Sequence, residues 1–291
     1  MAFKYPNIGN YQVPMVPIIW IGGRSYSTYQ IPGHVEIPEE LNVLGQAVVK
    51  EKLAAGARVA NNPTVSLTQI DIKNLRFGFQ SSDYFGFLAT HGSLERELSP
   101  GVAVRGEYPG LANLSTEKGF NRSPYSMMVG VSTMVLTTDG FCLFVHRSHR
   151  TAVVPGMRHV GLAEGMLPTD VNNRGSHDPV ETVLRGVQEE LASEKPGLKK
   201  IPVARSQIQL VALGMSYMLL QPDFACIWEA PCNMPTLLAH CAQASGRWEN
   251  QTAYAVKFDK NSILTELNSG GRTSPHAEFA IWAALKHRNM L

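Results

Sequence analysis

The sequence carries almost no net charge and no repetition. Its 26 lysines and arginines nearly balance 24 aspartates and glutamates, which leaves a formal charge of +2 over 291 residues. Proteins that bind nucleic acid through a general basic excess carry far more positive charge, so we expect no nucleic-acid partner and only a local site for an anion. The chain also has no internal repeat and no low-complexity tract, which excludes a repeat architecture.

Cysteines and long apolar runs are scarce as well. The four cysteines form no Cys-x-x-Cys pair, which fits a reducing cytoplasm better than a disulfide scaffold. The longest apolar region, residues 125–145, is interrupted by Asp139 and Gly140, and the first 14 residues contain prolines and a glycine where a secretory signal would be apolar. We therefore expect a soluble, cytoplasmic protein with no membrane partner.

The patterns that are present predict two domains. Residues 38–57 have the spacing of a helix, and the alternation over residues 65–79 is typical of strands. Residues 100–124 are rich in glycine and proline, so they are predicted to be a loop. We place the boundary there, between an N-terminal α+β domain of residues 1–120 and a second domain of residues 121–291.

The second domain has stronger signals. Two strand patterns, at 125–137 and 141–146, flank a Thr-Asp-Gly turn and predict a hairpin. Asp178 is a natural N-cap, Pro179 suits the first helical position, and Glu181 stands where a capping box has its acid. Further strands and helices are predicted over residues 207–220, 224–230, 235–244, 254–258 and 275–287.

The helix that follows Asp178 carries one arginine and two adjacent acids. Arg185 and Glu189 are four residues apart, so they share a helix face, and the guanidinium can orient the carboxylate. Glu190 follows directly, and the two acids together can reach a cation near the helix end. Mg²⁺ takes hard oxygen ligands and is often held by one or two carboxylates plus substrate phosphates. The pattern also suits an ordinary solvated helix face.

The wider context favours a catalytic interpretation. Residues 161–193 resemble the signature of the Nudix hydrolases, in which a glycine-rich turn precedes a helix that reads Arg-Glu-aliphatic-x-Glu-Glu-x-Gly. Leu162–Met166 stands at the position of the turn, and Arg185, Glu189 and Glu190 match the helix. The resemblance implies a Nudix-type α/β/α sandwich with a mixed sheet for the second domain, and a hydrolase that depends on Mg²⁺ or Mn²⁺.

Several positions depart from that signature. Gly186 replaces the first glutamate of the helix, His177 stands where the preceding loop has a glutamate, and Ser193 replaces the final glycine. We expect Glu164, in the turn, to replace the lost carboxylate as a metal ligand or to act as the general base. Asp170, Asp178 and Glu181 are weaker candidates for the same role.

The resemblance also implies a substrate. Residues 75–91 and the strands after the loop are similar to the animal Nudix enzymes that split UDP-glucose and UDP-galactose. This implies hydrolysis of the diphosphate linkage in a nucleoside-diphosphate derivative, for example a nucleotide sugar, to a nucleoside monophosphate and a phosphorylated product. The partner is then a small molecule, and a homodimer stays open.

Four residues outside the helix are candidates for binding this substrate. Arg147 and Arg150 follow a strand end and suit a phosphate. Trp248 lies in a polar loop, where it can stack on a base, and Glu249 beside it is a second candidate for the general base.

Two other functions stay open. Gly186 favours a catalytically weak or inactive nucleotide-binding or sensor protein of the same fold. A hydrolase or isomerase of a non-nucleotide diphosphate, such as a prenyl or inositol compound, would use the same acids.

Overall fold

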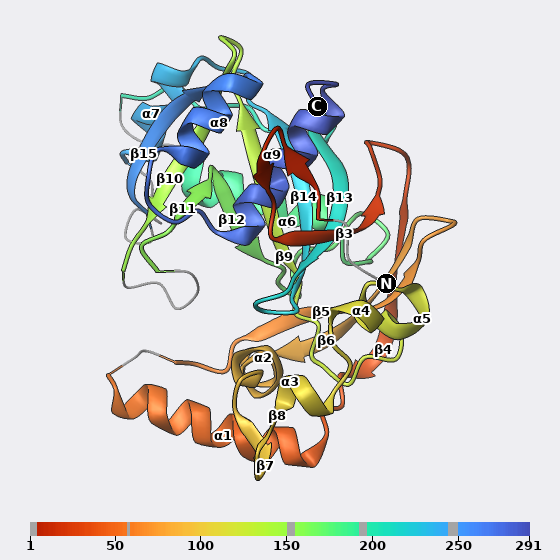
Figure 1. Cartoon of the computed structure of the whole chain (residues 1–291). Helices are drawn as coiled ribbons and strands as arrows, with labels where there is room; N and C mark the ends of the chain where they lie inside the picture. The colour runs from red at the N-terminus through yellow and green to blue at the C-terminus, as the bar shows by residue number, and fades with distance from the viewer. Residues whose placement is uncertain (1–4, 57–58, 150–154, 192–196, 244–249) are drawn as a thin grey trace.

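The computed structural model contains both sheets and helices, which confirms the expected α+β class (Figure 1). Its strands form an eight-stranded sheet, a three-stranded sheet and two two-stranded sheets. No helix in the described part of the chain combines the length and the apolar character that crossing a membrane requires. The structure describes residues 5–56, 59–149, 155–191, 197–243 and 250–291.

The eight-stranded sheet is the main sheet of the protein. Its strands are β3 (Met15–Trp20), β9 (Gly130–Leu136), β10 (Phe141–Arg147), β11 (Arg158–Val160), β12 (Leu162–Gly165), β13 (Ile208–Ser216), β14 (Pro222–Glu229) and β15 (Asn250–Lys257). The spatial order is β11-β10-β9-β14-β13-β3, with β12 beside β9 and β15 beside β10. The β9–β14 pair is parallel and the other pairs are antiparallel, so the sheet is mixed as expected.

The strands β9 and β10 diverge after a short contact, and this fork determines the position of Glu164. The predicted hairpin turn is confirmed, since Gly140 has a φ of +82° that glycine adopts without strain. The two strands pair only at Leu136 and Cys142 and then separate. Strand β11 continues on β10, and β12 continues on β9 with Glu164 opposite Val131. The fork therefore brings Glu164 onto the main sheet beside β9.

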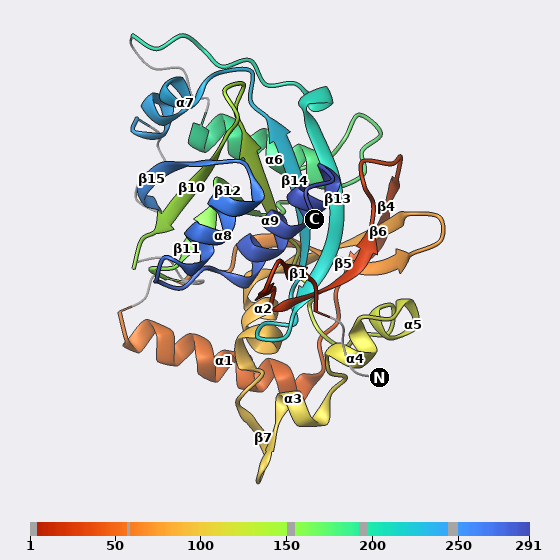
Figure 2. The same cartoon turned by 45° about the horizontal axis from the view of Figure 1, so that its top comes forward.

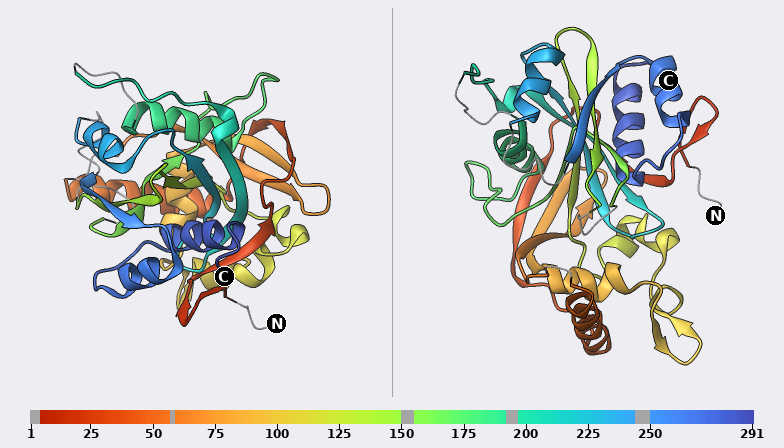
Figure 3. Two further views of the ribbon diagram at one scale, coloured as in Figure 1. Left: turned by 90° about the horizontal axis from the view of Figure 1, so that it is seen from above. Right: turned by 90° about the vertical axis from the view of Figure 1, so that its left-hand side faces the viewer.

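The two faces of the main sheet carry different helices (Figure 3). Helix α6 (Pro179–Gly186) packs Val180 and Val183 into the core on one face. Helix α9 (Pro275–His287), predicted with these bounds, packs Phe279 and its neighbours into a separate core on the other face. A Cβ atom on Gly214 would lie 2.5 Å from the Phe279 ring, so this glycine lets α9 approach β13. The layers are helix, sheet and helix.

The second, three-stranded sheet lies below the main sheet in Figure 1 and to the right of β13 in Figure 2. Its order is β4 (Ser27–His34), β6 (Arg76–Asp83) and β5 (Pro63–Asp71), and helices α1 (Glu39–Ala54) and α2 (Tyr84–Thr90) belong to the same part of the chain. Phe77 of β6 packs edge-on against Phe224 of β14, with ring centroids 5.2 Å apart. Since β3 joins the main sheet, the chain starts there, leaves for the smaller sheet and returns. The boundary between residues 120 and 121 stays a prediction.

Short elements complete the described chain. The predicted loop 100–124 contains three one-turn helices. In the last of them, Thr116 is the N-cap and Gly119 fits closely against Asn113. The remaining elements are β1 (Asn7–Ile8), β2 (Tyr11–Gln12), η1 (His91–Ser93), β7 (Glu97–Ser99), β8 (Val102–Ala103), α3 (Val104–Glu107), α4 (Leu111–Leu114), α5 (Glu117–Phe120), η2 (Val187–Leu191), η3 (Arg205–Gln207), α7 (Met234–Cys241) and α8 (Lys260–Asn268).

Candidate functional site

Helix α6 begins where the sequence predicts it. The Asp178 carboxylate accepts a hydrogen bond from the Val180 N–H at 3.0 Å, and Pro179 occupies the first turn. The predicted capping box is wrong, because the Asp178 N–H donates to the carbonyl of Asp170 and the Glu181 carboxylate pairs with Arg205 at 2.5 Å. Tertiary partners therefore replace the local reciprocal bond.

The two adjacent acids do not lie on an ordinary α-helix. After Gly186 the chain forms a π-helical turn, η2, in which Val187 and Leu191 are buried. Such turns are rare and occur often at functional sites. Glu189 and Glu190 both lie in this turn, and the pair of Arg185 with Glu189 that the i,i+4 spacing predicts is present at 3.2 Å.

Arg185 is the centre of an acidic cluster, made of Glu164, Asp170 and Glu189. Its Nε donates to Asp170 at 2.9 Å, and its Nη1 donates to Glu164 at 2.9 Å and to Glu189 at 3.2 Å. Burial disfavours the arginine's charge, but the hydrogen bonds and negative charges of Asp170 and Glu164 outweigh burial and raise the pKa of Arg185. The guanidinium is thus a fixed cation that orients three carboxylates.

Gly186 and Glu164 fit each other sterically. A Cβ atom on Gly186 would lie 2.7 Å from Cγ of Glu164 and 3.0 Å from a methyl carbon of Leu162. A larger residue at position 186 would displace the Glu164 side chain. The carboxylate of Glu164 therefore lies beside the helix position at which the Nudix signature has its first glutamate.

Asp170 is the buried acid of the cluster. Its side chain is 2% exposed and accepts hydrogen bonds from the Leu167 N–H and the Thr182 hydroxyl, each at 2.9 Å, besides those from Arg185. With its oxygens used in this way, Asp170 fixes the arginine and the loop before α6. Glu164 and Glu189 are 14% and 57% exposed, so they are the acids of the cluster that solvent or substrate can reach.

Glu190 lies close to α7. Burial first, and then the negative charge of Glu190, raise the pKa of the Cys241 thiol on α7 to about 12. Glu189 binds Arg185 at 3.2 Å. That Glu189 and Glu190 hold one cation stays a prediction.

The described residues fit a metal ion only together with substrate. Among them, no group of three or more Asp, Glu, His or Cys side chains is arranged to hold a metal by itself. Magnesium, however, needs only one or two carboxylates when phosphates and water complete its coordination. The donor set suits such an ion, since three carboxylates around one guanidinium leave two formal negative charges in excess.

Of the four predicted substrate-binding residues, Arg147 falls within the described part of the chain. Arg147, at the end of β10, lies near two buried histidines: its charge adds to burial in lowering the pKa of His159 and of His276, the latter to about 4. Arg150, Trp248 and Glu249 lie outside the described residues.

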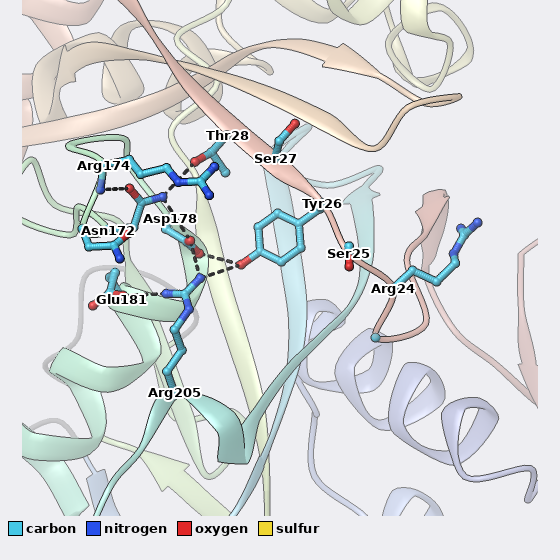
Figure 4. A pocket seen from close by; sticks show the side chains of 12 residues that line it. Arg24, Ser25, Tyr26, Ser27, Thr28, Asn172, Arg174, Asp178, Glu181 and Arg205 are labelled. Carbon is cyan, nitrogen blue, oxygen red and sulfur yellow. Dashed lines mark hydrogen bonds and ion pairs between the residues drawn. The ribbon is translucent and has the colours of Figure 1, made fainter.

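A polar cavity of about 550 Å³ lies at the other end of α6 (Figure 4). The Tyr26 hydroxyl donates to Asp178 at 2.6 Å, and Arg205 pairs with Asp178 and Glu181, each at 2.5 Å. Tyr26, Arg174 and Arg205 were not predicted from the sequence, since they come from three distant segments. The polar loop at residues 171–177 was the one local signal.

No family model matches the chain, and no curated protein matches it in sequence. Among solved structures, the chain is similar to the DR0079 protein of Deinococcus radiodurans, with 12% identity and a TM-score of 0.35 over 56% of this chain and 82% of that one. It is also similar to a MutT protein of Methanosarcina mazei Go1, with 13% identity and a TM-score of 0.33 over 56% of this chain and 96% of that one. Likenesses this low carry no argument, so the function is proposed from the chain's own residues.

Proposed function

We propose that the protein hydrolyses the diphosphate linkage of a nucleoside-diphosphate derivative, such as a nucleotide sugar. The products are a nucleoside monophosphate and a phosphorylated remainder. One observation carries the proposal: the Glu164 carboxylate lies over Gly186 and shares Nη1 of Arg185 with Glu189. Two solvent-accessible carboxylates therefore meet at Nη1 of Arg185, at the edge of the sheet. A site that lacks the first glutamate of the signature needs such a replacement carboxylate.

The formal charge of the cluster suits a phosphate substrate that arrives with a divalent cation. Glu164 and Glu189, with Glu190 as a further candidate, would hold Mg²⁺ or Mn²⁺. A bound divalent ion neutralises phosphate charge and acidifies water. Arg185 keeps the two carboxylates at fixed positions, and Asp170 keeps Arg185 in place. This preorganisation is the contribution of the chain itself.

The hydrolytic step balances with one water molecule. The water oxygen forms a bond to one phosphorus, the bond from that phosphorus to the bridging oxygen breaks, and the bridging oxygen leaves with the other phosphate. A carboxylate accepts the proton of the water. Glu164 is our first candidate for this base if Glu189 and Glu190 hold the ion; if Glu164 is itself a ligand, Glu249 is the candidate.

A coupled phosphate assay on a panel of diphosphates tests this function. With Mg²⁺ present, we expect turnover of UDP-glucose or ADP-ribose, and a loss of about 100-fold or more in kcat for Glu164→Gln and for Glu189→Gln. Glu97→Gln, which removes an exposed acid on β7, is the control and should keep full turnover. Hydrolysis of a prenyl diphosphate alone would establish the non-nucleotide alternative.

A second function, nucleotide binding without turnover, is favoured by one observation. All the acids of the cluster bind Arg185, and the described residues offer no preformed metal group. Saturable binding of UDP or ADP without hydrolysis, unchanged by Glu164→Gln, would support this sensor function and contradict the hydrolase.

A further inference from the structure

Three arginines line the cavity at the start of α6, and carboxylates neutralise one of them. Arg205 is matched by Asp178 and Glu181. The guanidinium of Arg174 has no hydrogen-bond or ion-pair partner among the described residues and points into the cavity (Figure 4). Arg24 donates to the carbonyls of residues 20 and 21 and extends away from Tyr26. Arg174 is therefore the cation that remains for a ligand.

The loop that carries Arg174 is folded. The Asn172 side-chain oxygen accepts from the N–H of Arg174 at 2.9 Å and from that of Ser176 at 3.2 Å. Its amide group donates to the Thr28 hydroxyl at 3.3 Å, and Gly175 has a φ of +74° that glycine adopts without strain. These bonds tie the loop to β4, so the backbone of Arg174 is held in place before any ligand arrives.

The other walls of the cavity are polar. No aliphatic side chain is among the residues that line it, and hydroxyls come from Ser25, Ser27 and Thr28. Glu181 offers carboxylate oxygens and Tyr26 offers a ring, whereas the buried Asp178 carboxylate already accepts from Tyr26, Val180 and Arg205. An apolar ligand would leave these groups unpaired at a cost of about 1–3 kcal/mol each. A ligand rich in hydroxyl groups can pair with them.

We propose that this cavity binds a phosphorylated sugar. Its phosphate is held by the guanidinium of Arg174 and the hydroxyl of Thr28. Its sugar hydroxyls donate to Glu181, which is 26% exposed and keeps its contact with Arg205. The volume of about 550 Å³ admits a pentose or hexose phosphate with water around it. The inference goes beyond the proposed hydrolysis and does not rest on it, because no metal and no residue of the Arg185 cluster takes part.

Titration calorimetry on the full chain tests the site. Three probes are used in buffer with EDTA: ribose 5-phosphate, ribose and inorganic phosphate. We expect saturable binding of ribose 5-phosphate, at least about tenfold tighter than that of either fragment. Arg174→Ala should weaken it about tenfold or more, since a charge-assisted bond to phosphate is lost. Arg272→Ala, an exposed arginine before α9 on the opposite face of the sheet, should leave it unchanged.

Three outcomes would overturn the inference. These are no saturable binding of ribose 5-phosphate, binding of inorganic phosphate or ribose with equal affinity, and equal affinity in wild type and Arg174→Ala. Glu164→Gln separates the two proposals. It should abolish hydrolysis and keep ribose 5-phosphate binding, so either proposal can fail without the other.

Discussion

Two arginines on opposite faces of the main sheet gather carboxylates in different ways. Arg158, on β11, is 2% exposed and donates to the Glu266 carboxylate at 2.8 Å and to carbonyls of residues 266, 267 and 271. The charge of Arg158 is balanced by one carboxylate, so the pair is formally neutral, and backbone carbonyls surround it. Arg185 meets three carboxylates, two of them reachable from outside. The Arg185 cluster therefore carries two formal negative charges in excess.

We interpret the difference as that between an arginine that stabilises the fold and one that belongs to the proposed site. A buried guanidinium whose terminal nitrogens donate to backbone carbonyls joins segments of the fold, and removing it leaves those carbonyls unpaired. A guanidinium outnumbered by carboxylates keeps like charges together, which costs stability unless a cation is bound there. We therefore expect changes at Arg158 to reduce stability and changes at Arg185 to reduce activity.

The largest effect is expected for Arg158→Ala. It leaves Glu266, which is 20% exposed, and several carbonyls without their donor, so the free energy of unfolding should fall by about 3–5 kcal/mol. Urea unfolding measures this, with the exposed Arg272→Ala as a control that changes it by less than about 0.5 kcal/mol. Arg158→Lys, which keeps the charge, provides a folded variant with an intermediate loss. A loss below about 1 kcal/mol for Arg158→Ala would contradict the structural role assigned to Arg158.

Arg185→Lys is expected to affect turnover more than folding. Lysine keeps the charge beside Asp170, but its single ammonium cannot span the carboxylates of Glu164, Asp170 and Glu189 as the planar guanidinium does. We expect kcat/KM to fall about 100-fold, a loss of about 2.7 kcal/mol in transition-state stabilisation. Steady-state kinetics and urea unfolding are measured on the same sample. Full turnover in the lysine variant would place Arg185 in the structural class.

The free energy of unfolding should depend on pH through Glu278, which lies on α9. Burial raises the pKa of Glu278 from its usual 4.5 to about 7, while Tyr11 donates to it at 2.6 Å. Between these values the unfolded chain loses the proton and the folded protein keeps it, so the free energy of unfolding falls as the pH rises from 4.5 to 7 and then levels. We expect Glu278→Gln to remove a drop of roughly 2 kcal/mol.

The measurement is the difference between wild type and Glu278→Gln at each pH. Burial lowers the pKa of His276 to about 4, and this group acts in the opposite direction, adding stability as the pH rises from 4 to 6.5. Its contribution cancels in the difference. A difference that stays constant from pH 4.5 to 7 would contradict the prediction.

The smallest effect is expected for Gly186→Ala. The new methyl group meets Glu164 at 2.7 Å; overpacking costs about 1–3 kcal/mol, and the better helix propensity of alanine returns up to about 1 kcal/mol. We expect a net loss of about 1 kcal/mol and a lower kcat. Gly165→Ala, which meets nothing within 4 Å, is the matched control. The double variant Glu164→Ala, Gly186→Ala should recover the stability loss, and a failure to do so would exclude this contact.

Helices with local signals could be predicted from sequence. The helix predicted over 38–57 is α1 (Glu39–Ala54), and that over 275–287 is α9 with both bounds correct. Asp178 and Ser274 cap their helices with their own side chains. Helix α8 was missed between the predicted strand 254–258 and α9, although Asp259 caps it.

The candidate site was predicted only in part. Arg185 with Glu189 follows from helical spacing, and the structure joins them at 3.2 Å. The proximity of Glu190 to α7 does not follow, because the two segments are distant in sequence and meet only in the tertiary structure. The roles of Glu164, Glu189 and Glu190 in catalysis stay predictions, as do those of Arg147, Arg150, Trp248 and Glu249.

The sequence by itself determined the α+β class, the starts of the main helices and the presence of one arginine among acids on α6. Each follows from groups within a few residues of one another, where spacing and capping act locally. Tertiary structure decided which carboxylates meet Arg185. Glu164 and Asp170 come from 21 and 15 residues away, and their approach depends on the fork in the main sheet and on the space that Gly186 leaves.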